Sequence, residues 1–172
     1  MAISYLISLE QLSVLAHFAG MASFAHLPNL PAIDRQRSEE LLEALGQQGM
    51  IHLRKAKDNK TEDAAAVDMT LAFVLKTMAK PALVVRATGD VLAYCTSELG
   101  IVVTPDPRNK SKYRIMPLPD AKELTQRIWE LCVKSDSEKI DTILHYNDEE
   151  PQEMQLTKPE LKAKISEVYS DN

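Results

Sequence analysis

Apolar residues near the start of the chain recur three or four positions apart, which predicts a helix over residues 9–19. Ser8 and Gln11 have the spacing of a capping box, and Gly20 fits the position after a helix end. One face of this helix carries Leu9, Leu12, Leu15, Ala16 and Ala19. We therefore expect a capped helix that packs against a core.

Pro28 and Pro31 exclude a regular helix from the next stretch, which nevertheless keeps apolar residues and is expected to lie against the core. A second helix is predicted to begin at Asp34 or Ser38 and to end near Gly46. Gly49 and the apolar residues 50–54 then indicate a turn and a short strand. A helix, a glycine turn and a strand in this order are also typical of winged-helix domains. The charged residues 55–63 are predicted to form a solvent-exposed loop.

The centre of the chain predicts a sheet that follows a buried helix. Residues 64–80 are largely apolar and are predicted to form this helix, which Pro81 ends. Three strand-like runs follow at 82–88, 90–104 and 112–118; the second is either one long strand or two strands that reverse at 98–100. Short connections favour antiparallel pairing, with helices on one face. The predicted fold class is α+β, an antiparallel β-sheet flanked by helical bundles.

Asp120 is a suitable N-cap for a helix that reaches Lys134, with Trp129 and Val133 at the flank of its apolar face. Residues 140–146 predict a strand or a short helix, and Pro159 begins a last helix. We expect a single α+β domain over 1–134 and a C-terminal extension over 135–172. Polar residues surround the run 140–146, so only this part of 135–153 is expected to be ordered against the body.

Composition and charge exclude several classes of function. The 172-residue chain has a formal net charge of −5, which argues against nucleic-acid binding because a phosphate-binding surface needs clustered Lys and Arg. It lacks an apolar run approaching the roughly 20 residues of a membrane span, so no membrane insertion is expected. The first residues lack the basic part of a signal peptide, which predicts a cytoplasmic protein.

Motifs for catalysis or cofactor binding are missing from the sequence. It contains no GxSxG, no HExxH and no glycine-rich phosphate loop. Cys95 and Cys132 are far apart and without CxxC spacing, so neither a metal nor a redox pair is predicted. We therefore expect no cofactor, no metal and no enzymatic activity.

The order of elements suggests a family. The segments LEQLSVLAHFAG, LPNLP, LGQQGMI, MAKPALVVR, DVLAYCTSELGIVVT and KYRIMPLPDAKELTQRIWEL follow one another between Leu9 and Leu131. In this order the chain resembles the EspG-like chaperones of bacterial type VII secretion systems. The resemblance lies in pattern and not in a short motif, the chain is short for that family, and residues from Ser135 onward have no counterpart. No contact residue of the family is carried over.

The resemblance implies a cytoplasmic chaperone or adaptor with a helical secreted partner, such as a helical hairpin or the N-terminal region of a toxin. Within the family, an antiparallel sheet flanked by helical bundles binds the tip of the substrate and keeps it soluble. Two alternatives stay open. A winged-helix transcription regulator would use residues 35–54, although Glu39 and Glu40 would repel DNA phosphates. An immunity or interaction protein without a role in export would differ only in its partner.

Two places are predicted to bind the partner. Trp129 and Val133 would form an aromatic anchor of the kind enriched at interface hot spots. Alternatively, the indole lies at the margin of the core or against the C-terminal tail. The second place is the loop that carries Pro107, Arg108, Asn109 and Lys110, which is either a contact loop or only a hairpin tip.

Overall fold

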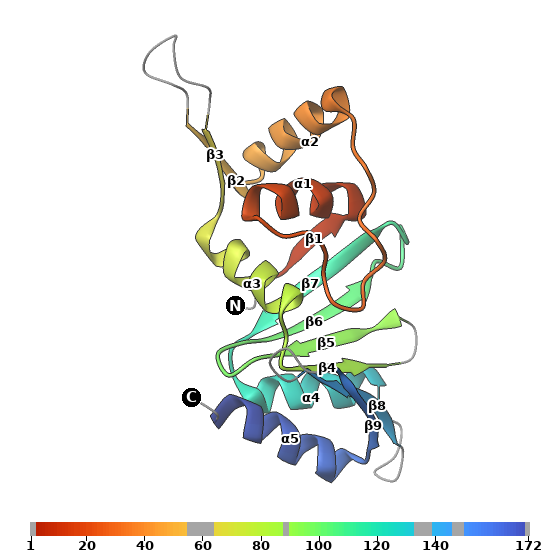
Figure 1. The fold of residues 1–172 in the computed structure, drawn as a ribbon. Coiled ribbons are helices and arrows are strands. Elements are labelled where there is room, and N and C mark those ends of the chain that lie inside the picture. Colours follow the sequence, from red (N-terminus) through yellow and green to blue (C-terminus); the bar gives the residue numbers. More distant parts are fainter. Residues whose placement is uncertain (1–2, 55–63, 88–89, 133–138, 146–149, 171–172) are drawn as a thin grey trace. The chain divides into compact units, whose positions relative to one another are not determined.

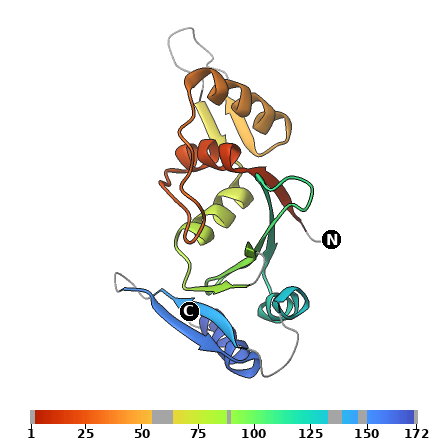
Figure 2. The same cartoon turned by 90° about the vertical axis from the view of Figure 1, so that its right-hand side faces the viewer.

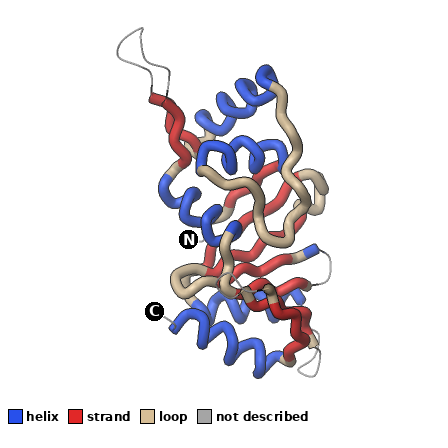
Figure 3. Tube along the Cα trace, viewed as in Figure 1, coloured by secondary structure: helices blue, strands red, loops and turns tan. Residues whose placement is uncertain are grey.

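The computed structural model describes residues 3–54, 64–87, 90–132, 139–145 and 150–170. Five helices and nine strands lie in this described part (Figures 1 and 3). The chain divides into two compact units, Ser8–Ala79 and the combination of Met1–Ile7 with Lys80–Asn172. The second unit contains a seven-stranded sheet, which confirms the predicted α+β class.

The unit Ser8–Ala79 consists of three helices and a β-hairpin. In chain order these are α1 (Leu9–Ala19), α2 (Arg35–Gln47), β2 (Ile51–Arg54), β3 (Ala64–Val67) and α3 (Met69–Ala79). The predicted capping box is present, since the Ser8 N–H donates to Gln11 Oε1 (3.0 Å) and the Gln11 N–H donates to Ser8 Oγ (3.1 Å). Gly20 has φ +76°, a left-handed conformation that ends α1. Asp34, and not Ser38, caps α2 by accepting from the Arg37 N–H at 2.8 Å.

The prediction of one helix over residues 64–80 is wrong at its start. Residues 64–67 form β3, which pairs antiparallel with β2 from Ile51↔Val67 to Arg54↔Ala64. Alanine favours helix, but the hairpin supplies a full ladder of backbone hydrogen bonds that overrides this preference. The helix begins only at Met69, where Asp68 Oδ2 accepts from the Leu71 N–H at 3.3 Å.

The proline-containing connector between α1 and α2 packs against its own unit, as predicted. Phe24 is buried, and the Ala25 N–H donates to the Met78 carbonyl oxygen of α3 at 3.1 Å. Ser13 of α1 donates its hydroxyl to the Pro31 carbonyl oxygen at 2.8 Å. Side-chain and backbone donors thus replace the helical hydrogen bonds that the prolines prevent.

The seven-stranded sheet has the order β1-β7-β6-β5-β4-β8-β9. Its strands are β1 (Tyr5–Ser8), β4 (Leu83–Arg86), β5 (Leu92–Cys95), β6 (Gly100–Pro105), β7 (Lys112–Leu118), β8 (Ile140–Leu144) and β9 (Gln152–Leu156). All pairs from β7 to β9 are antiparallel. The run 90–104 therefore forms two strands, and the chain reverses where the Thr96 N–H donates to the Leu99 carbonyl oxygen (2.9 Å).

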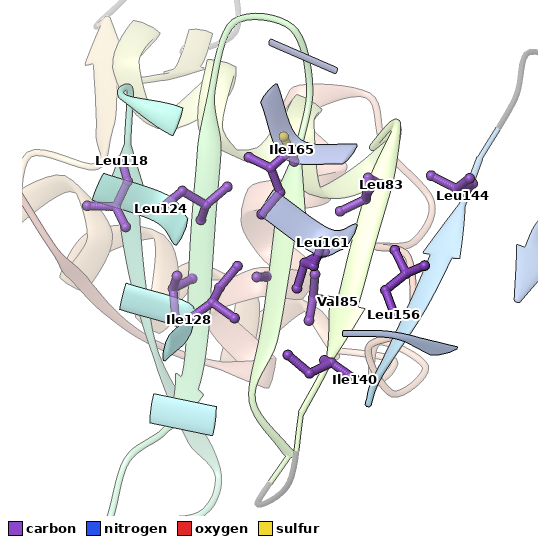
Figure 4. Packing of buried hydrophobic residues seen from close by; sticks show 13 residues of the cluster. Leu83, Val85, Leu118, Leu124, Ile128, Ile140, Leu144, Leu156, Leu161 and Ile165 are labelled. Atoms are coloured by element: carbon purple, nitrogen blue, oxygen red, sulfur yellow. The ribbon is translucent and has the colours of Figure 1, made fainter. Parts of the chain in front are cut away.

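Helices α4 (Ala121–Cys132) and α5 (Lys158–Ser170) pack against one face of this sheet (Figure 4). Figure 4 shows Leu124 and Ile128 of α4, with Leu161 and Ile165 of α5, over the strands. The buried cluster consists of Leu83, Val85, Ala93, Cys95, Val102, Leu118, Leu124, Ile128, Ile140, Leu144, Leu156, Leu161 and Ile165. One hydrophobic core thus joins the central strands to the last two helices.

The C-terminal residues belong to this core. Residues 140–144 form β8, in agreement with the strand or short helix expected at 140–146, but β9 pairs with β8 from Ile140↔Leu156 to Leu144↔Gln152, so Gln152 and Glu153 are ordered as well. Residues 135–138 and 146–149 of the predicted tail lie outside the described residues. Figure 2 shows α5 along the β8–β9 hairpin. The two units therefore have bounds that differ from the expected division at residue 134. The physical reason is that β8 continues the sheet beside β4, which places the apolar residues of α5 over the same face.

A close contact joins α5 to the start of β6. The Tyr169 hydroxyl donates to the Leu118 carbonyl oxygen at 3.0 Å. A Cβ atom at Gly100 would meet the Tyr169 hydroxyl, and would lie 2.6 Å from Leu124 Cδ2. Only glycine leaves room here for the tyrosine and the leucine.

Candidate functional site

The structure places the predicted anchor Trp129 at the margin of the core. Its side chain is partly buried and packs against the cluster of α4, α5 and the sheet. The ammonium group of Lys158, at the start of α5, lies 5.3 Å from the centroid of the indole ring. Two of the three alternatives for Trp129, the core margin and the C-terminal tail, therefore apply together. Val133, the second residue of the predicted anchor, lies outside the described residues.

The predicted contact loop is the tip of the β6–β7 hairpin. Asn109 organises it, because Asn109 Oδ1 accepts from both the N–H (3.1 Å) and the hydroxyl (2.6 Å) of Ser111. The Asp106 N–H also donates to the Lys112 carbonyl oxygen at 2.9 Å, which closes the turn. The four predicted binding residues, Pro107, Arg108, Asn109 and Lys110, are exposed. The loop is thus available for contact, whereas Trp129 is covered in part by its own unit.

A different apolar surface lies on α3 in the other unit. Met69 is 87% exposed and Phe73 is 41% exposed, although α3 buries Leu71, Val74, Leu75 and Met78 on its opposite side. Positions i and i+4 lie one above the other on a helix, so Met69 and Phe73 form one stripe. We call these two residues the α3 stripe. Large apolar side chains exposed at helical spacing are typical of surfaces that bind another protein.

Sequence analysis missed the α3 stripe because it predicted a single buried helix over residues 64–80. The signal in the sequence was that apolar residues lie on most sides of α3 and that Lys76 is its only charged residue. Such a helix is buried on all sides or keeps an apolar face exposed, and only the packing decides between the two.

A small apolar recess lies beside α1 in the same unit. It has a volume of about 290 Å³ and lies between Val14 and Phe18 of α1 and residues 31–33 of the connector. Phe18 is 37% exposed, and the His17 ring meets it edge-on at a centroid distance of 5.3 Å. The recess has room for one apolar side chain of a partner, with Ser13, His17 and Ser38 as polar lining.

The arginines of α2 are paired with carboxylates. Arg37 Nε lies 3.1 Å from Glu10 Oε2, and its Nη1 lies 3.2 Å from Glu40 Oε2. The hydrogen bond to Glu10, followed by that to Glu40, raises the pKa of Arg37. Arg35 Nε lies 3.4 Å from Glu39 Oε1. The exposed face of α2 therefore offers DNA phosphates an arginine charge that acidic neighbours already balance.

The described residues provide little for metal or thiol chemistry. Among them, no three His, Cys, Asp or Glu residues are grouped closely enough to hold a metal ion. Cys95 is buried, and desolvation raises the pKa of its thiol to about 12. A thiol with this pKa stays protonated near neutral pH and is a poor nucleophile.

None of the described helices has the length and the apolar character that crossing a membrane requires. Compared with models of known protein families and with curated proteins, the chain matches none.

Proposed function

We propose that this protein is a cytoplasmic chaperone or adaptor that binds a helical substrate of a type VII secretion system and keeps it soluble until export. The single observation that carries a binding function is the α3 stripe, where Met69 and Phe73 are exposed on one helical face. The secretion system comes from the sequence resemblance to EspG-like chaperones. A role as an immunity or interaction protein without export would use the same surface.

A helical partner fits this surface. Side chains one turn apart on α3 form a ridge that packs between the side chains of a second helix. Two side chains, 87% and 41% exposed, cover only part of the roughly 800 Å² that each partner buries in a standard interface. The stripe is therefore the apolar centre of a larger contact and is too small to hold a stable complex by itself.

Co-expression with helical proteins encoded nearby, followed by pull-down, tests the proposal. Met69→Glu and Phe73→Glu place a charge in the centre of the contact and are expected to lower retention of the partner at least tenfold, because an unpaired charge is costly to bury. Gln36→Glu is the matched control, since it adds the same charge at an exposed position of α2 in the same unit. Circular dichroism confirms that each variant is folded.

Three results would contradict the proposal. Failure of the folded wild-type protein to retain any helical partner would remove the binding function. Equal retention by all three variants would leave the binding function but move it away from α3. A partner that is retained but secreted normally without this protein would favour the interaction role without export.

One observation favours the second candidate, a winged-helix regulator. Helix α2 leads through Gly49 directly into the antiparallel β2–β3 hairpin, which is the order of a recognition helix and a wing. The arginines of α2 argue against DNA binding, because each is paired with a carboxylate. Titration with promoter DNA at low and moderate salt tests this function. Salt-sensitive binding with a Kd below about 10⁻⁶ M would support it, because that affinity exceeds typical non-specific binding.

A further inference from the structure

A pocket of about 310 Å³ lies at one end of the seven-stranded sheet, within the unit that contains the sheet. Four segments meet there: residues 80–82 before β4, residues 96–97 after β5, residues 144–145 at the end of β8, and α5. Backbone hydrogen bonds hold the first three segments together. The Ala82 N–H donates to the Cys95 carbonyl oxygen, and the His145 N–H donates to the Ala82 carbonyl oxygen, both at 2.9 Å. We call this the sheet-end pocket.

The sheet-end pocket is lined by both apolar and polar residues. Pro81 and Leu144 are buried, and Val168 of α5 is partly buried beside them. The hydroxyl group of Ser97 adds hydrogen-bonding capacity, whereas that of Thr96 already donates to the Leu99 carbonyl oxygen at 3.3 Å. The volume is at the lower end of the range for small-molecule sites, about 300 to 1,000 Å³.

Cationic groups outnumber anionic ones in this pocket. Lys80 and Lys164 line it together with one carboxylate, Glu167, so the three charges sum to +1 in a chain whose net charge is −5. Lys164 Nζ lies 3.6 Å from Glu167 Oε2, and the Glu167 side chain is largely exposed. Glu167 is thus a weak counter-ion that can turn into solvent and leave Lys164 to a ligand.

His145 also lines the pocket and is partly buried. Desolvation lowers the pKa of its imidazole, so the ring is neutral near pH 7 and adds hydrogen-bonding capacity without charge. The site therefore carries a single surplus charge, which suits a monoanion better than a phosphate dianion.

From this arrangement we propose that the sheet-end pocket binds a carboxylate that carries an apolar group, with the carboxylate on Lys80 and Lys164 and the apolar group over Pro81, Leu144 and Val168. A free small organic acid and the C-terminus of a polypeptide share this chemistry. The proposal does not depend on partner binding at α3.

The test uses the full chain and isothermal titration with N-acetyl-leucine, which has the carboxylate and the isobutyl group of a leucine C-terminus. Binding with a Kd of about 1 mM is the expected result for a ligand of this size. N-acetyl-leucinamide, which lacks the charge, is expected to bind about tenfold more weakly. Hexanoate distinguishes the two sources: if it binds equally well, a free acid suffices, and if only the acetylated amino acid binds, the pocket recognises a polypeptide C-terminus.

Substitutions in α5 assign the binding to this pocket. Lys164→Gln is expected to weaken N-acetyl-leucine binding about tenfold, whereas Lys162→Gln, at an exposed position of the same helix outside the pocket, leaves it unchanged. Glu167→Gln removes the competing carboxylate and is expected to tighten binding several-fold. Thermal unfolding monitored by circular dichroism identifies variants that fail to fold, and Lys80→Gln then replaces Lys164→Gln. No binding by the folded wild type, equal affinity for acid and amide, or equal loss with Lys162→Gln overturns the proposal.

Discussion

At the scale of single residues, the close approach between Gly100 and Tyr169 requires a residue without a side chain at position 100. Tyr169 donates from α5 to the Leu118 carbonyl oxygen at the end of β7, and Gly100 pairs with Leu118 across the sheet. The position of the Tyr169 hydroxyl depends on the absence of a side chain at Gly100, because a Cβ atom there would overlap it. A pattern of apolar residues does not reveal this requirement, because it involves positions 69 residues apart.

Gly100→Ala is expected to destabilise the protein by about 2 kcal/mol, because the new methyl group overlaps Leu124 and the Tyr169 hydroxyl in a packed core. Urea denaturation measures the change. Tyr169→Phe is the companion variant and is expected to cost about 1 kcal/mol through the lost hydrogen bond. Wild-type stability of Gly100→Ala would show that α5 does not pack over β6 as described.

At the scale of elements, Asp68 marks the change from β3 to α3. Its Oδ2 accepts from the Leu71 N–H, while its Oδ1 lies 3.3 Å from Nε2 of His52 on β2. The hydrogen bond to His52, followed by that to the Leu71 N–H, lowers the pKa of Asp68. One carboxylate thus caps the helix and connects it to the hairpin.

Asp68→Ala is expected to cost about 1 to 2 kcal/mol at pH 7, as for other lost N-caps. Because the folded pKa of Asp68 lies below the unfolded value, its contribution to stability is present above about pH 4 and is lost as the pH falls through the lowered pKa. The stability difference between wild type and Asp68→Ala should therefore shrink at pH 3. His52→Gln, which keeps the helix cap, should lower the free energy of unfolding by less than Asp68→Ala does. If the stability difference between wild type and Asp68→Ala does not change with pH, the Asp68 carboxylate is not the group responsible.

Trp129 on α4 is expected to contribute to the stability of the unit that contains the sheet. Because the indole packs against the core cluster, Trp129→Ala is expected to cost about 3 kcal/mol of unfolding free energy. Lys158→Ala removes only the cation–π contact, for which about 0.5 to 1 kcal/mol is expected. Denaturant titration measures both. If Trp129→Ala instead leaves stability unchanged and weakens partner binding, the indole is the anchor predicted from the sequence.

At the scale of the whole molecule, the C-terminal residues complete the unit that contains the sheet. Leu156, Leu161 and Ile165 are buried in the cluster that includes Leu83 and Ile128. Removing β9 and α5 would uncover the part of the sheet face that α5 covers, because α4 is the one other described helix in that cluster.

Truncation after residue 149 is therefore expected to abolish cooperative unfolding of this unit and to cause aggregation, since a large apolar area becomes exposed. Deletion of residues 171–172 alone is the control and should leave the melting curve unchanged. Size-exclusion chromatography and thermal denaturation provide the measurements. A truncated chain that stays monomeric and unfolds cooperatively would show that residues 150–172 are an independent extension.

Much of the fold can be predicted from local sequence, because helix caps, prolines and apolar spacing act within a few residues. The Ser8–Gln11 capping box, the end of α1 at Gly20 and the strand at 112–118 are each encoded in this way. The reversal after Cys95 was one of two alternatives that short-range pattern left open. These signals were sufficient for the α+β class and for most elements.

What only the tertiary structure decided depends on contacts between distant residues. Ala64–Val67 is a strand because β2 lies beside it, and the C-terminal residues belong to the core because β8 pairs with β4. The α3 stripe and the sheet-end pocket are products of packing, which decides which apolar residues stay exposed and which segments meet. Local propensities differ by less than about 1 kcal/mol per residue, so burial and strand pairing outweigh them wherever the two disagree.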